Sequence, residues 1–540
     1  MPEETRGNNQ REHEIRRERE QELRRSYTDA AGVLRADLRR QGILHVRGMR
    51  MVAARRARAR HRLPAPGAPA AAMLPGAPGA VGVVGAQWVS IGPAPLRIDA
   101  EQIYQGSGPV SGLVSDIAID PAGGTDRIIY IAALSGGVWK STDGGTSWQP
   151  KMDALVSEAI SAVALDSGDS STVYAGTSTF TSMGLFKSTD GGETWILLDS
   201  ALFSGRDIYR IVLPASDVLL VATDFGLFRS VDGGLHFGNN APQFDNDAPV
   251  LSGDVTGLRL DTASPATTVL AAVSGMGLFR STDAGVTFPT NLFANAGAPA
   301  AGTYAFVAFA QSTQPDAQTL YAYVQANPHR GLFKSVNGGA TWSELLAGAT
   351  CADQNGGAQL GYDQTLGVDP RNASRVYLGF QELYLSTDGG NTFGIPAISR
   401  FKIHWDHHAL VFSPQSHWSG QPTRFYVGTD GGIATSADGG ITFSNLNEGI
   451  GSNLFYGIDI GRGSDDSNRY TYGGCQDTGT VERRPAFAGR DWHLGIDGDG
   501  GPVAVDPHDP QRCYGSDDSG YIRTTDAGAS WKGGGLAGHV

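Results

Sequence analysis

The stretch STDGGETW, residues 188–195, decides the fold, because closely related phrases recur seven more times along the chain. The others begin at Ser141, Ser230, Ser281, Ser335, Ser386, Ser436 and Thr524. Successive phrases start 47, 42, 51, 54, 51, 50 and 88 residues apart. A nearly fixed period indicates an array of similar structural units. The last, nearly doubled interval predicts one further unit that lacks the phrase.

Each phrase has the features of a turn between two strands. A short apolar strand such as GLFK precedes it, and Trp or Phe follows it. The Asp at its third position can accept backbone N–H groups across the turn, and Gly can adopt the positive φ that such turns need. We therefore expect these aspartates to fix turns and to contact no ligand.

Two more short strands precede each phrase, and the second of them reads, for example, TVYAGTS, VLLVATD or RFYVGTD. Each unit is thus predicted to be a four-stranded antiparallel sheet of about 45 residues, which needs radial stacking to bury its faces. We expect an all-β fold: a single large β-propeller of about nine four-stranded blades, with eight or ten as alternatives. Residues 88–93 could lend an outer strand that closes the ring.

The pattern S-x-D-x-G-x-T-W resembles the Asp-box, or BNR, repeat of sialidases, sortilins and xyloglucanase-type glycoside hydrolases, over residues 88–540. Longer phrases such as DHHALVFSP and DGDGGPVAVDP are similar to those of bacterial sortilin-like and glycosyl-hydrolase-like propellers. The resemblance implies a propeller that binds carbohydrate polymers on the face opposite the repeated turns, with xyloglucanase-like hydrolysis left open. A non-catalytic, sortilin-like propeller that binds peptide or protein, or a scaffold, is the alternative.

Two departures from the enzyme families bear on activity. Nothing like the FRIP phrase of sialidases precedes the first unit, so sialidase activity is not expected. In the first unit, Leu134 and Ser135 stand where xyloglucanase-type enzymes carry an acid. The resemblance therefore leaves the catalytic base of that family without its expected residue.

Charge divides the chain into an arm and a body. Residues 1–62 hold 17 Arg, no Lys and nine acids, a net charge of +8, and are predicted to form a solvated helical arm that could contact another protein. Residues 63–87 form a Pro/Ala/Gly linker, and residues 88–540 form the propeller. The remainder carries 25 basic and 46 acidic side chains, or −21, which excludes nucleic-acid binding by the propeller.

The sequence says less about location. No stretch approaches the roughly 18 consecutive apolar residues of a membrane span. The first residues hold no apolar segment like that of a secretory signal, although the resemblance implies an extracytoplasmic or secreted protein, so a cytoplasmic location stays open. Cys475 and Cys513 fall in adjacent units and could pair in an exported protein or remain isolated thiols.

The loops opposite the repeated turns carry acids, and these acids are concentrated in the later units. Asp430 and Asp477 occupy equivalent positions in adjacent units and could face one pocket. Glycoside hydrolysis requires a pair of carboxylates, so the candidate catalytic residues are Asp430, Asp477 and Asp499; alternatively, these acids cap turns beside glycines. The candidate ligand-binding residues are Asp224, Glu382, His404, Trp405, Asp406, Gln476 and Asp497.

The run HWDHH, residues 404–408, is the densest group of metal-ligand side chains. Imidazole and carboxylate groups suit zinc, manganese or iron. On a strand, His404, Asp406 and His408 would share one face, so these three are predicted to hold a divalent metal. A hydrogen-bonded structural network of His and Asp is the alternative, and no other cofactor is predicted.

Overall fold

The repeated units fold into nine sheets of antiparallel strands, numbered here in chain order. The computed structural model describes residues 90–534, apart from 103–105, 123–124, 154, 156–158, 179–181, 239–247, 303, 305, 313–316, 326–329, 348–362, 397–402, 418–422, 462–469, 488–489 and 518–519. The regular secondary structure of the described part is nearly all strand, with the short helices α3 (Ser200–Phe203), η3 (Leu292–Ala294) and η6 (Pro414–His417). The predicted arm (1–62) and linker (63–87) lie outside the described residues.

Sheets 1 to 4 are four-stranded. Sheet 1 holds β3 (Val114–Ile119), β4 (Ile129–Ala133), β5 (Gly137–Ser141) and β6 (Gln149–Pro150). Sheet 2 holds β7 (Ile160–Asp166), β8 (Asp169–Thr177), β9 (Leu185–Ser188) and β10 (Ile196–Leu198). Sheet 3 holds β11 (Ile208–Ala215), β12 (Val218–Thr223), β13 (Gly226–Ser230) and β14 (Leu251–Ser252). Sheet 4 holds β15 (Val255–Leu260), β16 (Val269–Val273), β17 (Gly277–Ser281) and β18 (Thr290–Asn291).

Sheets 5 to 7 continue the same meander. Sheet 5 holds β19 (Phe306–Gln311), β20 (Leu320–Gln325), β21 (Arg330–Ser335) and β22 (Ser343–Ala347). Sheet 6 holds three strands, β23 (Thr365–Asp369), β24 (Asn372–Gly379) and β25 (Leu383–Ser386). Sheet 7 holds β26 (His407–Phe412), β27 (Phe425–Thr429), β28 (Gly432–Ser436) and β29 (Ser444–Asn445).

Sheets 8 and 9 complete the described part. Sheet 8 holds β30 (Phe455–Ile460), β31 (Thr471–Cys475), β32 (Gly479–Arg483) and β33 (Trp492–Ile496), with β1 (Leu96–Gln102) and β2 (Gly106–Val110) added at its outer edge. Sheet 9 holds β34 (Gly500–Val505), β35 (Cys513–Asp517), β36 (Gly520–Thr524) and β37 (Lys532–Gly534). Sheet 8 is the unit predicted from the nearly doubled interval between phrases.

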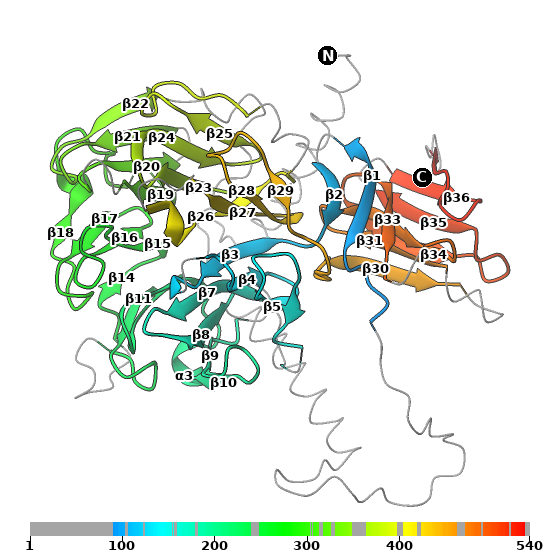
Figure 1. Cartoon of the computed structure of the whole chain (residues 1–540), viewed down its shortest axis with the longest axis horizontal. Helices are drawn as coiled ribbons and strands as arrows, with labels where there is room; N and C mark the ends of the chain where they lie inside the picture. The colour runs from blue at the N-terminus through cyan, green and yellow to red at the C-terminus, as the bar shows by residue number, and fades with distance from the viewer. Residues whose placement is uncertain are drawn as a thin grey trace, which may run out of the picture. The chain divides into compact units, whose positions relative to one another are not determined.

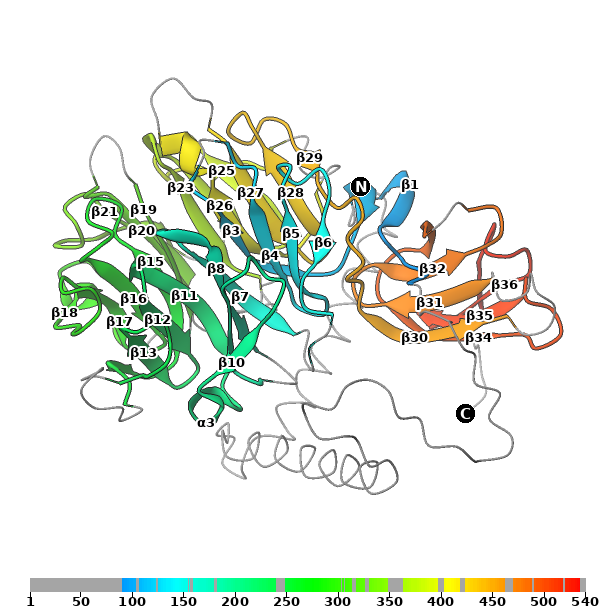
Figure 2. The same cartoon turned by 60° about the horizontal axis from the view of Figure 1, so that its bottom comes forward.

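Seven of the nine sheets close into a ring, so the expectation of about nine blades in one ring is wrong. The first strands of sheets 1 to 7 lie side by side in succession, and β26 of sheet 7 returns to lie beside β3 of sheet 1 (Figures 1 and 2). Side chains of these two sheets share one core, which includes Ile117, Trp139 and Tyr426. The sequence repeat cannot reveal this closure, because a unit that begins a new array has the same pattern as one that continues the old.

A buried carboxylate reinforces the closure of the ring. Asp126, in the β3–β4 loop, accepts hydrogen bonds from Ser413 Oγ at 2.6 Å and from Tyr426 OH at 3.2 Å. Both donors belong to the seventh sheet's unit, almost 300 residues away in sequence. Side-chain packing and these hydrogen bonds therefore join sheets 1 and 7, without a strand exchanged between them.

The first strand of the described part, β1, belongs to sheet 8 and not to the ring. The expectation was that residues 88–93 close the ring, whereas β1 begins at Leu96 and pairs in parallel with β33 at the edge of sheet 8. Arg97 on this strand forms ion pairs with Glu448 at 2.9 Å and with Asp491 at 3.3 Å. The strand therefore enlarges sheet 8 instead of closing the ring.

The repeated phrases form the turns between third and fourth strands, as expected. In the second phrase, Asp190 accepts hydrogen bonds from Ser188 Oγ at 2.8 Å, Thr194 N at 2.8 Å and Thr194 Oγ1 at 2.6 Å. The backbone N–H of Gly192 donates to Ser188 Oγ at 2.8 Å. The same arrangement recurs in the other phrases, one of which has Asn337 in place of the aspartate, so the third residue of each phrase satisfies the backbone of its turn.

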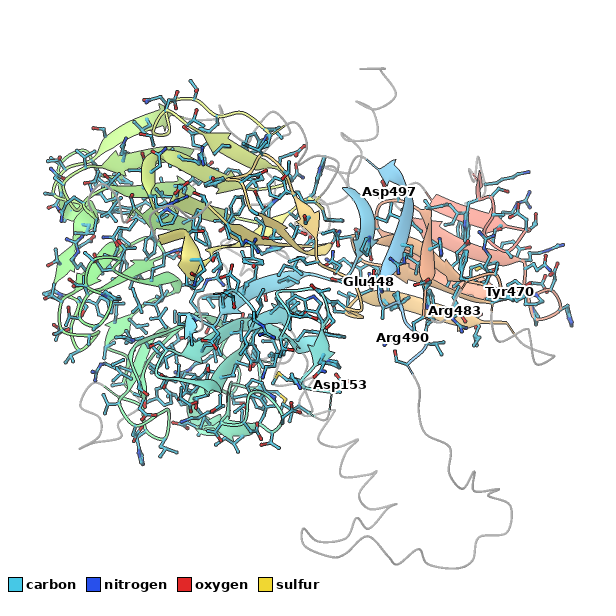
Figure 3. The ribbon with its side chains drawn as sticks, in the orientation of Figure 1. Asp153, Glu448, Tyr470, Arg483, Arg490 and Asp497 are labelled. Carbon is cyan, nitrogen blue, oxygen red and sulfur yellow. The ribbon has the colours of Figure 1, made fainter. Side chains whose placement is uncertain are left out.

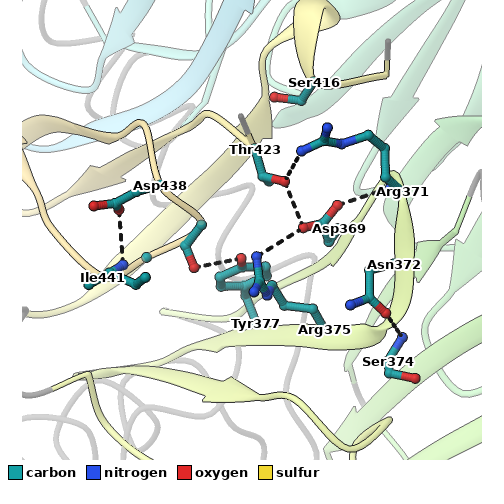
Figure 4. Close-up of polar contacts among 12 residues, drawn as sticks. Asp369, Arg371, Asn372, Ser374, Arg375, Tyr377, Ser416, Thr423, Asp438 and Ile441 are labelled. Atoms are coloured by element: carbon teal, nitrogen blue, oxygen red, sulfur yellow. Dashed lines mark hydrogen bonds and ion pairs between the residues drawn. The ribbon is translucent and has the colours of Figure 1, made fainter. Parts of the chain in front are cut away.

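Polar side chains also join neighbouring sheets on the side of the repeated turns (Figure 4). Buried Asp369, at the end of β23, accepts hydrogen bonds from Thr423 Oγ1 at 2.9 Å and from Arg375 Nη1 at 3.4 Å. Tyr377 OH on β24 donates to the carbonyl of Gly439 in the turn of the next sheet at 2.9 Å. The turn that contains Gly439 is therefore also a contact between sheets.

Two further expectations concern membranes and cysteines. No helix in the described part of the chain is long and apolar enough to cross a membrane. Cys475 and Cys513 are buried free thiols, so they form no disulfide with each other. Burial raises the pKa of both thiols to about 12, which keeps them protonated and unreactive.

Candidate functional site

The ends of the sheets opposite the repeated turns bring three aspartates together. Asp406 directly precedes β26, and Asp430 directly follows β27, both in sheet 7. Asp477 lies in the short β31–β32 loop of sheet 8. One carboxylate oxygen from each of the three lies within 4.8 Å of the other two. We call Asp406, Asp430 and Asp477 the junction cluster, because it joins sheet 7 of the ring to sheet 8.

Two histidines of the HWDHH run hold the cluster in place. His408 Nε2 lies 2.6 Å from Asp430 Oδ1, so the ring positions that carboxylate. His404 contacts two carbonyl oxygens, Trp405 O at 3.0 Å from Nδ1 and Asp477 O at 3.1 Å from Nε2. Carbonyl oxygens only accept, so both contacts are hydrogen bonds only when both ring nitrogens carry a proton. His404 thus links sheets 7 and 8.

The backbone around the cluster has unusual conformations and one close contact between a glycine and a histidine. Asp406 and Asp477 have positive φ values of 59° and 56°, a conformation that is uncommon outside glycine. Gly431, next to Asp430, lies against His404, and a Cβ at that glycine would come within 2.5 Å of the imidazole ring. Any other residue at position 431 would therefore push His404 away from the cluster.

Burial and the neighbouring acids favour the protonated form of Asp477. Burial, followed by the charges of Asp430, Asp499 and Asp406, holds the pKa of Asp477 well above its usual range. Asp499 Oδ1 also accepts the backbone N–H of Asp477 at 2.8 Å. A carboxyl group with a raised pKa can retain a proton near neutral pH and donate it.

A fourth acid, Asp363, belongs to this group and was missed from the sequence. Burial, then the charge of Asp406 and a side-chain hydrogen bond with it, hold the pKa of Asp363 well above its usual range. Residue 363 precedes β23 as residue 406 precedes β26. The signal was present: YDQTL at 362–366 parallels WDHHAL at 405–410, with an aromatic residue and an acid before the first strand.

The cluster offers two kinds of chemistry. Three carboxylate oxygens so close together form a donor set suited to a hard divalent cation such as Ca²⁺ or Mg²⁺. Without a cation, close carboxylates share protons, and one can act as an acid while another acts as a base or nucleophile. Both depend on the convergence of sheets 7 and 8.

The predicted metal trio differs from the one the structure assembles. The strand begins at His407, so the expected alternation does not extend over residues 404–406. His408 is directed at Asp430 and His404 at a backbone carbonyl, and Asp406 alone is common to both trios. Metal ligation by His404, Asp406 and His408 stays a prediction.

The other candidates lie at varying distances from the cluster. Trp405, Gln476 and Asp497 are half-buried. Trp405 and Gln476 directly precede Asp406 and Asp477 in sequence, and Asp497 lies at the opposite end of sheet 8 from Arg490 (Figure 3). Buried Glu382 lies in the β24–β25 loop, where the carbonyl of Gln381 accepts the N–H of Asp406 at 3.1 Å. Exposed Asp224, in sheet 3, accepts the N–H of Asp207 at 3.2 Å and is not part of the cluster.

Comparison with solved structures shows the fold. The chain is similar to a GH74 enzyme of Niastella koreensis, with 18% identity, a TM-score of 0.55 and coverage of 81% of this chain and 68% of that one. It is also similar to the GH74 xyloglucanase of Xanthomonas campestris, with 17% identity, a TM-score of 0.55 and coverage of 80% and 69%. An ancestral GH74 enzyme matches with 18% identity and a TM-score of 0.50, covering 79% and 69%.

These likenesses support a β-propeller of the kind seen in glycoside hydrolases. No family model matches the sequence, and no curated protein matches it. At identities below one fifth, the similarity concerns the fold, and the chemistry has to be argued from the junction cluster.

Proposed function

We propose that this protein is a carbohydrate-directed propeller that cleaves glycosidic bonds at the junction cluster. The observation that carries the proposal is the convergence of Asp430 and Asp477 from two sheets, with the pKa of Asp477 raised. A glycosidase needs one carboxyl group that donates a proton to the leaving oxygen and one that attacks or activates water. The likeness to GH74 enzymes supports the choice of a carbohydrate polymer as substrate.

The roles follow from the surroundings of each acid. Asp477, with its raised pKa, is the general acid. Asp430, held by His408 at 2.6 Å, is its partner, which attacks or activates water. Asp499 orients Asp477 through the backbone N–H that it accepts, and is a positioning residue. Half-buried Trp405, Gln476 and Asp497 are proposed to contact the sugar beside the acids.

The spacing of the acids favours one stereochemical course. The nearest carboxylate oxygens of Asp430 and Asp477 lie within 4.8 Å. Retaining glycosidases have their carboxyl groups about 5–5.5 Å apart, and inverting ones have them about 6.5–9.5 Å apart to admit a water molecule. Asp430 is therefore proposed as a nucleophile, and the products are expected to keep the anomeric configuration of the substrate.

The first test is the release of reducing ends from xyloglucan, other β-glucans and bacterial polysaccharides. Wild type is expected to cleave at least one of them, and Asp430→Asn and Asp477→Asn are expected to lose about 100-fold or more of the rate. Asp499→Asn should lose less, because it acts through Asp477. Asp153→Asn, an exposed acid in sheet 1's unit, is the matched control and should keep the wild-type rate.

The outcome separates enzyme from binding protein. No release from any polymer, with wild-type binding retained in a pull-down of the same panel, would leave a non-catalytic propeller that binds glycan. Binding of peptides in place of glycans would support the sortilin-like alternative. Release by wild type that survives Asp477→Asn would place the chemistry outside the junction cluster. An extracytoplasmic location is proposed with this function, because polymers of this kind lie outside the cell.

A further inference from the structure

Two arginines outside the junction cluster reach across the interior of the ring. Arg259 on β15 donates from Nη2 to the carbonyl of Leu366 on β23 at 3.3 Å. Arg210 on β11 donates to the carbonyls of Ser115 on β3 and His408 on β26, both at 3.5 Å. None of these strand pairs is adjacent, since β19 separates β15 from β23 and β7 separates β11 from β3. Hydrogen bonds between non-adjacent inner strands cross the ring, so both guanidinium groups lie near its axis.

Two guanidinium groups and one ion-paired carboxylate meet inside the ring. Asp116 on β3 forms an ion pair with Arg210, at 3.7 Å from Nη1. Arg259 has no carboxylate partner in the described part of the chain, and the contact with Leu366 is its single hydrogen bond there. A guanidinium carries five N–H donors. Arg259 therefore has donors left for a ligand.

Solvent reaches these groups although protein surrounds them. Arg259 is exposed, and the Arg210 side chain is 33% exposed. The protein around Arg259 reduces its hydration, and this desolvation, followed by the charge of Arg210, lowers the pKa of Arg259 to about 10. The group therefore remains charged at neutral pH. Enclosure by protein strengthens the attraction of a positive group for an anion relative to a group on the open surface.

We propose that Arg259 and Arg210 bind the carboxylate of a uronic acid residue at the ring axis. Guanidinium groups recognise carboxylates through paired N–H donors, which gives both charge and direction. Arg210 contacts the carbonyl of His408, whose imidazole holds Asp430, so the axis lies next to the junction cluster. The identity of the ligand rests on the proposed function: an acidic glycan would place one sugar on the axis and its scissile bond at the cluster.

The test is calorimetric titration of the whole protein with D-galacturonate and D-glucuronate, and with D-glucose as the neutral probe. Wild type is expected to bind a uronate and not glucose. Arg259→Gln should weaken binding about tenfold or more, since one charge-assisted contact is lost, and Arg210→Gln should weaken it as well. Arg523→Gln, an exposed arginine of sheet 9, is the matched control and should bind like wild type. Circular dichroism checks that each variant is folded.

Several results would overturn the proposal. These are the absence of uronate binding at millimolar concentration, equal loss in Arg259→Gln and Arg523→Gln, or equal binding of inorganic phosphate. Tighter binding of a short peptide through its terminal carboxylate would assign the axis to peptides. Titration of Asp477→Asn separates this proposal from the proposed function, because uronate binding should persist there even if no polymer is cleaved.

Discussion

Aspartates lie at both ends of these sheets, and the two groups differ in what surrounds them. At the repeated turns, hydrogen bonds from the Thr194, Thr392 and Ser530 side chains and backbones lower the pKa of Asp190, Asp388 and Asp526 to about 2. At the junction cluster, burial and neighbouring acids raise the pKa of Asp477. The same residue type is ionised at low pH in one place and protonated at higher pH in the other.

The difference separates a structural role from a chemical one. A turn aspartate has its acceptors filled by the turn that it stabilises, so it has nothing to offer a ligand. A junction aspartate faces other carboxylates, an arrangement that costs stability and is typical of functional sites. Substitutions at the two ends should therefore change the free energy of unfolding in opposite directions.

The largest expected effect is at a turn. Asp438 accepts hydrogen bonds from Ser436 Oγ at 2.9 Å, Ile441 N at 3.0 Å, Thr442 N at 2.9 Å and Thr442 Oγ1 at 2.6 Å. Figure 4 shows the contact with Ile441. Asp438→Ala removes all four, and we expect it to lower the free energy of unfolding by about 2–3 kcal/mol. Urea titration measures this. Asp153→Ala, at an exposed acid, should lower the free energy of unfolding by about 0.5 kcal/mol or less. Equal losses in Asp438→Ala and Asp153→Ala would show that the turn aspartates stabilise the fold no more than other exposed acids.

At the junction cluster, substitution of an aspartate is expected to raise the free energy of unfolding, where at the turn it lowers it. Asp477→Asn removes a carboxylate that the folded protein holds among Asp406, Asp430 and Asp499. A carboxyl group whose pKa is raised by folding stabilises the folded protein at low pH. This contribution is lost as pH rises from the pKa of the unfolded state, about 4, through the pKa of the folded state. Asp477→Asn should therefore be about 1–2 kcal/mol more stable than wild type at pH 7 and equal to it near pH 4.

Urea titrations at both pH values give this difference directly, with Asp153→Asn, at an exposed acid outside the cluster, as the control. A variant that is less stable than wild type at pH 7 would mean that the carboxylate is compensated, for example by a bound cation. The same titration with added EDTA tells these cases apart.

Sequence reasoning recovered what is local. The phrases such as STDGGETW are turns because Ser, Asp, Gly and Thr satisfy one another within eight residues, and that information is contained in the phrase. The pairing of Asp430 with Asp477 could also be anticipated, because both follow the second strand of adjacent units. Periodicity alone fixes such equivalent positions.

Long-range contacts could not be predicted in the same way. Closure of the ring brings Asp126 to Ser413 and Tyr426, a contact that no repeat pattern encodes. The convergence of Asp406 with the other two acids depends on a positive φ at Asp406, whereas strand alternation had been assumed there. Arg210 and Arg259 occupy ordinary strand positions, and only the closed ring brings them to one axis.

A smaller effect is expected at the one phrase without an aspartate. In SVNGGATW, Asn337 Oδ1 accepts Thr341 N at 2.9 Å, while Asn337 Nδ2 donates to Thr341 Oγ1 at 2.8 Å. Asn337→Asp would supply a carboxylate to both groups and should raise the free energy of unfolding by about 1 kcal/mol at pH 7.

The new carboxyl should have its pKa lowered by folding, as Asp190 and Asp388 do. The gain should therefore be present above about pH 4 and disappear as pH falls towards 2. Thermal melts of Asn337→Asp and wild type at pH 7 and pH 3 measure it. Asn391→Asp, two residues after Gly389 in another phrase, places a charge near a turn but removes the Nδ2 donor to the carbonyl of Asp388 at 2.6 Å, so it should lose stability. An equal gain there would attribute the effect to charge alone.

The smallest effect concerns two phrases that carry Ala where the others have Gly. Ala284 and Ala527 have φ values of 57° and 60°, in the range where the equivalent Gly144 and Gly191 have 75° and 73°. A Cβ in this conformation costs about 1 kcal/mol, and the greater freedom of glycine in the unfolded chain offsets part of it. Ala284→Gly and Ala527→Gly should each gain about 0.5 kcal/mol. Ala529→Gly, two residues after Ala527 and without a positive φ, should lose stability, because there glycine brings the entropic cost and relieves no strain.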